Sequence, residues 1–183
     1  MVRPVRGMIA GAVLGVLAAL GASVPASAQE KQPDLISFGV GIFDVQKNEP
    51  RDKAADFRVE YRFGTSLFPA IEDYVAVRPF VGGEVTSDGG MYGLGGLMFD
   101  IPIGPLNFTP NFGIGLHHDG GGKELGSVIE FRSTAELSYR FENQSRLGVS
   151  FGHISNAGIT TLNPGSEIFT VYYHLPSSWL FGY

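Results

Sequence analysis

The sequence predicts an all-β protein, an eight-stranded antiparallel transmembrane β-barrel of the bacterial outer membrane. Three observations predict it: the chain begins with the features of an export signal, apolar and polar residues alternate through most of the remainder, and the polar positions carry charges of both signs. Alternation with a period of two is typical of a β-strand. An even number of such strands after an export signal is typical of outer-membrane barrels.

The N-terminal segment has the composition of a secretory signal peptide. Two arginines supply its positive charge, residues 8–22 are apolar and uncharged, and residues 26–28 (Ala-Ser-Ala) have the small side chains of a cleavage site. The apolar run is shorter than the about 20 residues that a membrane-spanning helix needs. We therefore expect residues 1–28 to be a cleaved signal peptide and residues 29–183 to form a single outer-membrane β-barrel.

The overall composition narrows the class of protein further. The formal net charge of −5 argues against a protein that binds nucleic acid, which requires a basic surface. The chain contains no cysteine, so neither disulfide bonds nor thiolate chemistry is available to it.

The expected strands follow one another with short interruptions. In residues 57–63, apolar and aromatic side chains alternate with Arg58, Glu60 and Arg62, and in residues 129–141 they alternate with a second set of mixed charges. Six further runs show the same period of two, with varying clarity: residues 36–42, 77–85, 91–101, 106–116, 147–151 and 169–175. Eight strands therefore fit the chain.

Alternation alone does not say which face of a strand meets the core. In a soluble lipocalin-like barrel or sandwich the apolar positions face inward, whereas in an outer-membrane barrel they face lipid and the polar positions fill the lumen. The runs reach roughly 9–11 residues, the length of a tilted transmembrane strand. Charges of both signs on the opposite positions suit an interior network of ion pairs. These features favour the membrane barrel and leave the soluble one as the alternative.

An N-terminus in the periplasm determines which connections face outward. The extracellular loops are then expected at residues 46–53, 87–90, 118–126 and 156–166, and the periplasmic turns at residues 65–73, 102–105 and 142–145. The turn at 65–73 is long for the periplasmic side. Trp179, Phe181 and Tyr183 keep the lipid-facing positions of the last run, but Pro176 and two serines intervene, so the end of the last strand stays open, with an extension to Tyr183 as one alternative.

Three polar residues are expected on the outer wall of this barrel. His153 and Ser155 continue the lipid-facing positions of the seventh strand, and Glu167 begins those of the eighth. An imidazole or a charge that faces lipid is costly unless it is paired or lies at the interface. Three such groups at the extracellular end of adjacent strands predict a site for a lipid substrate. The alternative is that they are interfacial residues at a junction between strand and loop, without a catalytic role.

The three residue types are those of a hydrolytic triad. His153 would take the proton of Ser155, Ser155 would attack an ester carbonyl, and Glu167 would orient the imidazole. Asn156 and the backbone at Gly158 are candidate donors to an oxyanion. No G-x-S-x-G motif surrounds Ser155, so an α/β-hydrolase is not indicated.

Residues 153–158 (HISNAG) and 163–167 (NPGSE) resemble the motif of the lipid A 3-O-deacylase family, PagL. The expected signal peptide, the length and the eight-strand pattern agree with this family. The resemblance implies an outer-membrane esterase that hydrolyses the ester-linked 3-hydroxyacyl chain at the 3-position of lipid A in the outer leaflet. Two alternatives stay open: a small non-catalytic barrel for adhesion or membrane integrity, and an outer-membrane phospholipase.

The resemblance also implies roles for residues and partners. It implies a catalytic triad and a supporting set: Ser155 as nucleophile, His153 as base, Glu167 as third member, Asn156 and Gly158 around the oxyanion, and Asn163 as a hydrogen-bonding support. It implies no metal site and no other cofactor, and lipopolysaccharide as the substrate. A homodimer is left open.

Other polar residues carry weaker signals. His117 and His118, followed by Asp119, resemble a metal-binding pair, but a third ligand at metal spacing does not accompany them, so we interpret them as the tip of a loop. His174 is expected in the lumen or at its periplasmic rim. We interpret Lys123, in an expected outer loop, as a solvated charge, with contact to lipid A phosphates as the second interpretation.

Overall fold

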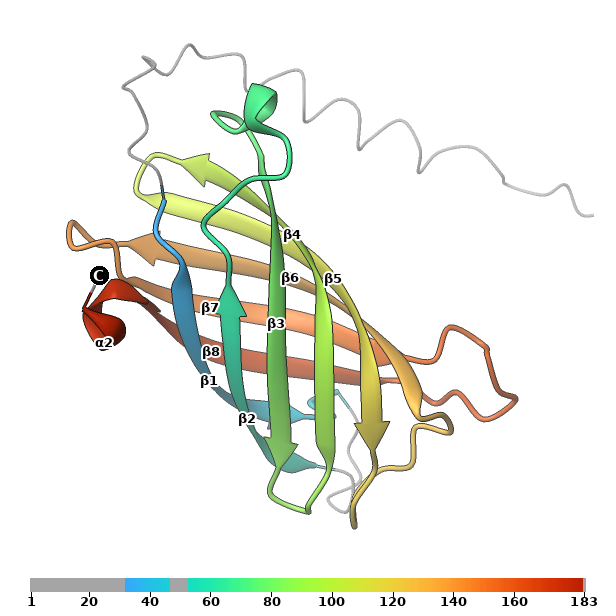
Figure 1. The fold of residues 1–183 in the computed structure, drawn as a ribbon. Coiled ribbons are helices and arrows are strands. Elements are labelled where there is room, and N and C mark those ends of the chain that lie inside the picture. Colours follow the sequence, from blue (N-terminus) through green and yellow to red (C-terminus); the bar gives the residue numbers. More distant parts are fainter. Residues whose placement is uncertain (1–31, 47–52, 183) are drawn as a thin grey trace, which may run out of the picture.

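The computed structural model describes residues 32–46 and 53–182, so the expected signal peptide lies outside the described residues. Eight antiparallel strands form the molecule: β1 (Leu35–Phe43), β2 (Ala54–Arg62), β3 (Ala76–Thr86), β4 (Met91–Ile103), β5 (Leu106–His118), β6 (Ile129–Arg140), β7 (Arg146–Ser155) and β8 (Ser166–Pro176). Each strand pairs with its neighbours in sequence, and β1 also pairs with β8, which closes the barrel (Figure 1). The eight predicted strands are confirmed.

The side chains of the barrel are arranged with their apolar positions outward. On β6, Leu137 is 45% exposed while its neighbour Glu136 is 1% exposed, and the same alternation runs along the strand. A soluble barrel would bury the apolar set instead. The chain is therefore an outer-membrane barrel, and the lipocalin-like alternative is wrong. Among the described residues, no helix is long and apolar enough to cross a bilayer.

Charged side chains fill the middle of the lumen, as the mixed charges predict. Arg62 lies 2.8 Å from Glu136 across the barrel, and Arg58 lies 3.0 Å from Glu84. These groups are almost fully buried, so each charge depends on its partner. Removing one partner of such a pair usually costs about 3–5 kcal/mol of stability, because the other charge is left buried and unpaired.

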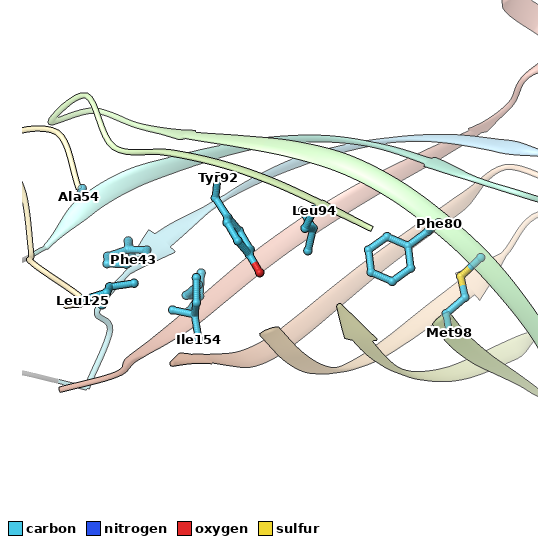
Figure 2. Packing of buried hydrophobic residues seen from close by; sticks show 9 residues of the cluster. Phe43, Ala54, Phe80, Tyr92, Leu94, Met98, Leu125 and Ile154 are labelled. Atoms are coloured by element: carbon cyan, nitrogen blue, oxygen red, sulfur yellow. The ribbon is translucent and has the colours of Figure 1, made fainter. Parts of the chain in front are cut away.

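Apolar side chains close the end of the lumen that is expected to be extracellular. Phe43, Ile154 and Leu125 gather there beside Tyr92, and Phe80 and Met98 lie further along the barrel (Figure 2). Leu125 belongs to the loop between β5 and β6 and is fully buried. This loop therefore folds inward and packs on the ends of the strands.

The C-terminal end does not form the extended strand that the aromatic pattern leaves open. β8 ends at Pro176, and residues Ser178–Phe181 form the short helix α2. Pro176 has no N–H with which to continue the strand ladder, and the Ser177 carbonyl then accepts hydrogen bonds from Leu180 and Phe181. Of the alternatives left open for the end of the last strand, the structure therefore has the shorter one.

The two ends of the barrel have different connections. α2 lies at the same end as the turns at residues 104–105 and 141–145, whereas the loop between β7 and β8 projects from the opposite end (Figure 1). The turn between β2 and β3, which is expected on the periplasmic side, contains the 3-10 helix η1 (Pro69–Ile71). The candidate site lies at the end that carries the loop between β7 and β8.

Candidate active site

The candidate catalytic residues lie on two paired strands. His153 of β7 and Glu167 of β8 are directly opposite each other in the antiparallel register. Their side chains face outward, since they are 46% and 25% exposed while the residues that flank them are buried. Directly opposed residues on one face of a sheet are close enough for their side chains to interact. The register thus brings together two residues that are separated by the whole β7–β8 loop.

The imidazole of His153 contacts the carboxylate of Glu167. His153 Nδ1 lies 3.3 Å from Glu167 Oε1. A carboxylate on Nδ1 is the arrangement that orients the base of a hydrolytic triad, because it leaves Nε2 to exchange a proton with the nucleophile. The predicted pair of base and acid therefore has the geometry that its proposed role requires.

Ser155 lies at the end of β7, two residues beyond His153. Positions two apart in a strand share a face, and Ser155 is partly exposed on this face, opposite Phe131 of β6. Within the described part of the chain, no hydrogen bond joins the Ser155 hydroxyl to His153. Catalytic hydrogen bonds are often long or misaligned before a substrate binds, so this arrangement is compatible with a nucleophile and does not by itself establish one.

Gly165 packs directly against the imidazole of His153. A Cβ atom at this position would lie 2.7 Å from His153 Cε1 and 3.1 Å from Nε2, and the backbone has φ = +60°. Only glycine allows both this close approach and this left-handed conformation without strain. Sequence reasoning placed Gly165 in the motif but gave it no role; the structure makes it a neighbour of the atom that would take the proton.

A tight turn follows Ser155. Ala157 and Gly158 have φ values of 54° and 82°, and the N–H of Ile159 donates a hydrogen bond of 3.0 Å to the carbonyl of Asn156. Positive φ at both central residues is the pattern of a type I′ turn. Ala157 is in a conformation that costs a non-glycine residue about 1–2 kcal/mol, so the surrounding contacts must hold it there.

The side chain of Asn156 provides those contacts from inside the loop. It is fully buried, and its Nδ2 donates to the carbonyls of Leu125 at 3.1 Å and Leu162 at 2.8 Å and to the Thr160 hydroxyl at 3.0 Å. Its Oδ1 accepts a hydrogen bond from the Gly158 N–H at 3.0 Å. Both ends of the carboxamide are therefore hydrogen-bonded within the loops. This geometry fits a residue that supports the turn, and it does not fit a side chain that donates to the oxyanion.

Asn163 holds the other side of the same turn. Its Oδ1 accepts a hydrogen bond of 3.0 Å from the backbone N–H of Asn156. The backbone donors at Asn156 and Gly158 are thus both occupied within the loop in this structure. An oxyanion would have to replace Asn156 Oδ1 at the Gly158 N–H.

The remaining histidines lie away from this face. His117 is buried at the end of β5, with Nδ1 3.3 Å from Asp119 Oδ1, so its interpretation as a loop tip is wrong; His118 beside it is exposed. Among the described residues, no group of three or more acidic, histidine or cysteine side chains could hold a metal ion. His174 is fully buried in the lumen, as predicted.

The outer wall also has a hollow of about 700 Å³ whose lining does not include His153, Ser155 or Glu167. Its lining is formed by residues of β1 to β5, among them Phe38, Phe57, Val85 and Leu116. Gly83 and Gly93 also line it, and they face each other in the register. The candidate site is therefore an exposed patch on β7 and β8, separate from this hollow.

Comparison with known proteins identifies the family. Residues 86–176, which include His153, Ser155 and Glu167, match the family model described as lipid A 3-O-deacylase (PagL). The chain belongs to this family. No curated protein sequence matches it.

Two solved structures share the fold of this PagL-family chain. One is the outer-membrane enzyme PagL, with a TM-score of 0.59 and 18% identity over 78% of this chain and 99% of that one. The other comes from the de novo design of transmembrane β-barrels, with a TM-score of 0.54 and 14% identity over 80% and 98% of the two chains. Because a designed barrel matches nearly as well as an enzyme, the fold alone does not indicate an activity.

Proposed function

We propose that the protein is a lipid A 3-O-deacylase, a serine esterase that hydrolyses the ester-linked 3-hydroxyacyl chain at the 3-position of lipid A. One observation carries the proposal. The His153–Glu167 contact lies on the outer wall at the extracellular end, beside Ser155, in a chain of the lipid A 3-O-deacylase family.

The position of these residues favours a lipid as the substrate. A site on the outer wall near the extracellular loops is accessible from the outer leaflet, where lipid A resides. A water-soluble ester in the lumen is a poor alternative, because ion pairs fill the middle of the lumen and Phe43, Leu125 and Ile154 close its extracellular end.

The proposed reaction begins with proton transfer from the Ser155 hydroxyl to His153 Nε2. The serine oxygen attacks the ester carbonyl and forms a tetrahedral oxyanion. Collapse of this intermediate breaks the ester C–O bond, and His153 gives the proton to the leaving sugar hydroxyl. Water, deprotonated by His153, then releases the 3-hydroxy fatty acid and regenerates Ser155. Glu167 holds the Nδ1–H and stabilises the positive imidazole in both steps.

The turn after Ser155 is the proposed oxyanion site. The Gly158 N–H would donate to the oxyanion, while Asn156 and Asn163 hold the turn in position. In other serine hydrolases one such donor contributes about 2.7–4 kcal/mol to the stability of the transition state. Because Gly158 donates to Asn156 Oδ1 in the free protein, we expect the substrate to take over this hydrogen bond as it binds.

Mass spectrometry of lipid A tests the proposal directly. Cells that express the wild type should lose one 3-hydroxyacyl chain from lipid A, and cells that express Ser155→Ala at the same level should not. Unchanged lipid A with a folded wild-type barrel would favour a non-catalytic protein. Loss of an acyl chain that persists in Ser155→Ala would contradict the nucleophile.

The same experiment separates the phospholipase alternative. Phospholipids extracted from these cells should be unchanged, and purified protein should release 3-hydroxy fatty acids from lipopolysaccharide and no fatty acids from phosphatidylethanolamine. Release from the phospholipid at a similar rate would contradict the assignment to lipid A.

A further inference from the structure

A buried ion pair lies at the extracellular end of the barrel, inside the wall that carries the triad. Lys123 Nζ lies 2.7 Å from Asp44 Oδ1, and the two side chains are only 5% and 0% exposed. Lys123 belongs to the loop between β5 and β6, and Asp44 directly follows β1. The interpretation of Lys123 as a solvated loop charge is therefore wrong.

Asp44 connects this pair to the strand that carries Glu167. Its Oδ1 accepts a second hydrogen bond, 3.1 Å long, from the hydroxyl of Ser166. The backbone N–H of Val45 donates to the carbonyl of Glu167 at 2.9 Å. The segment that begins at Asp44 thus holds both Glu167 and the residue before it.

Lys123 connects the pair to the turn that follows Ser155. Two residues beyond Lys123, the carbonyl of Leu125 accepts a hydrogen bond from Asn156 Nδ2. The next carbonyl, that of Gly126, accepts one from the Thr160 hydroxyl at 3.0 Å. The loop of Lys123 is therefore bound to the loop between β7 and β8 at two adjacent carbonyls.

The conformation of Asp44 indicates that its position is tightly specified. Its φ of 57° is left-handed, which is unusual for a residue other than glycine. Among the described residues, Asp44 Oδ2 has no hydrogen-bond partner, so Oδ1 alone receives both Lys123 and Ser166. Such strain persists only where the surrounding contacts determine it.

We propose that Lys123 and Asp44 are positioning residues that fix the proposed acid, Glu167, relative to the turn after the nucleophile. This inference rests on the proposed function for its kinetic consequences. The pair touches neither substrate nor reacting atoms; it acts through Ser166 on one side and through Leu125 on the other. A buried ion pair often adds little stability over an apolar replacement. In this proposal its contribution is to hold its two segments in one relative position.

Kinetics on purified, folded protein test the proposal. Lys123→Met should lower kcat for deacylation of lipopolysaccharide by about a hundredfold, the size expected from a misplacement of about 1 Å, and leave KM almost unchanged. Lys123→Arg should recover part of kcat, because it restores the charge. Equal kcat values for Lys123→Met and the wild type would overturn the proposal.

A second ion pair at the other end of the barrel provides the matched control. Arg146 Nη1 lies 3.0 Å from Asp100 Oδ2, and both side chains are 4% exposed. Arg146→Met leaves a buried carboxylate short of a partner, as Lys123→Met does, but far from the proposed site. It should lower the stability of the barrel and keep kcat. A fall in kcat as large as that of Lys123→Met would mean that general destabilisation is responsible, and would overturn the proposal.

Amide hydrogen exchange tests the connection without relying on activity. Exchange in residues 156–167 should be faster in Lys123→Met than in the wild type, and unchanged in Arg146→Met. Unchanged exchange in Lys123→Met would overturn the proposal even if kcat fell. If the wild type proved inactive on lipopolysaccharide, the proposed function would fail, and faster exchange in these residues would still support the positioning of the loop by the pair.

Discussion

The described part of the barrel contains two constellations of serine, histidine and glutamate, one on the outer wall and one in the lumen. On the outer wall, His153 contacts Glu167 at 3.3 Å and Ser155 lies two residues away. In the lumen, His174 Nε2 lies 3.1 Å from Glu136, and Nδ1 lies 2.7 Å from the hydroxyl of Ser37.

Contact geometry alone would favour the constellation in the lumen. The set in the lumen is the better hydrogen-bonded one, yet Ser37, Glu136 and His174 are inaccessible, at 1% exposure or less. Glu136 is also neutralised by Arg62, so it belongs to the interior ion-pair network. The comparison favours the outer set as the catalytic candidate, because its side chains are exposed on the wall and because, among the described residues, no hydrogen bond occupies Nε2 of His153.

The serines give the largest expected contrast between the two sets. Ser155→Ala should lower kcat for deacylation of lipopolysaccharide by up to about 10⁶-fold, as the loss of the nucleophile does in other serine hydrolases. Ser37→Ala removes an equally well-defined hydroxyl and should leave kcat close to that of the wild type. Comparable kcat values for the two purified variants would contradict the proposal that the outer set is catalytic and the lumen set is not.

The glutamates should differ in what their loss affects. Glu167→Gln should lower kcat by about 10⁴-fold, in line with the third member of other triads, with little change in stability because the side chain is partly exposed. Glu136→Gln should keep kcat for the folded protein and lower the free energy of unfolding by about 3–5 kcal/mol, since Arg62 loses a buried partner. Kinetics and denaturant titrations of both variants test these two expectations. Retained activity in Glu167→Gln would contradict the assignment of Glu167 as the third member of the triad.

Gly165 tests whether the backbone of the outer site positions the imidazole of His153. Gly165→Ala should push the imidazole of His153 from its position and lower kcat by about a hundredfold. Gly104 is the matched control, because its φ of +62° is almost the same and a Cβ there meets nothing within 4 Å. Gly104→Ala should introduce the same backbone strain without a contact to His153, and its kcat should equal that of the wild type. If both variants have the same kcat, the contact with His153 is not important.

Asn163 should have the smallest effect of the set. Asn163→Ala removes one acceptor, for the Asn156 N–H, and a typical net hydrogen bond is worth about 1 kcal/mol. We expect kcat to fall about fivefold, with faster amide exchange in the loop between β7 and β8. A loss as large as that of Ser155→Ala would mean that Asn163 has a direct role in the reaction.

The sequence was informative wherever strand periodicity decides the outcome. Alternation along β6 is sufficient to predict that Glu136 faces the lumen and Leu137 faces lipid, and the same rule predicts the shared outer face of His153 and Ser155. The antiparallel register then places Glu167 beside His153, because the two strands are neighbours in the chain.

The loops could not be predicted in the same way. Lys123 and Asp44 are 79 residues apart, and no periodic pattern relates two loops that meet only after the barrel closes. The inward direction of the Asn156 carboxamide depends on the carbonyl of Leu125, which comes from another loop. The helix α2 depends on the end of the strand ladder at Pro176, whereas the aromatic pattern of the last residues resembles a strand.

Covalent labelling by a fluorophosphonate, read by peptide mass spectrometry, tests the central claim most directly. The reagent forms a stable adduct with an activated serine. We predict an adduct on Ser155 of the purified barrel, slower labelling in the presence of lipopolysaccharide, and no adduct in His153→Gln. An adduct on Ser37, or labelling of Ser155 that neither lipopolysaccharide nor His153→Gln affects, would contradict an outer-wall triad that acts on lipid A.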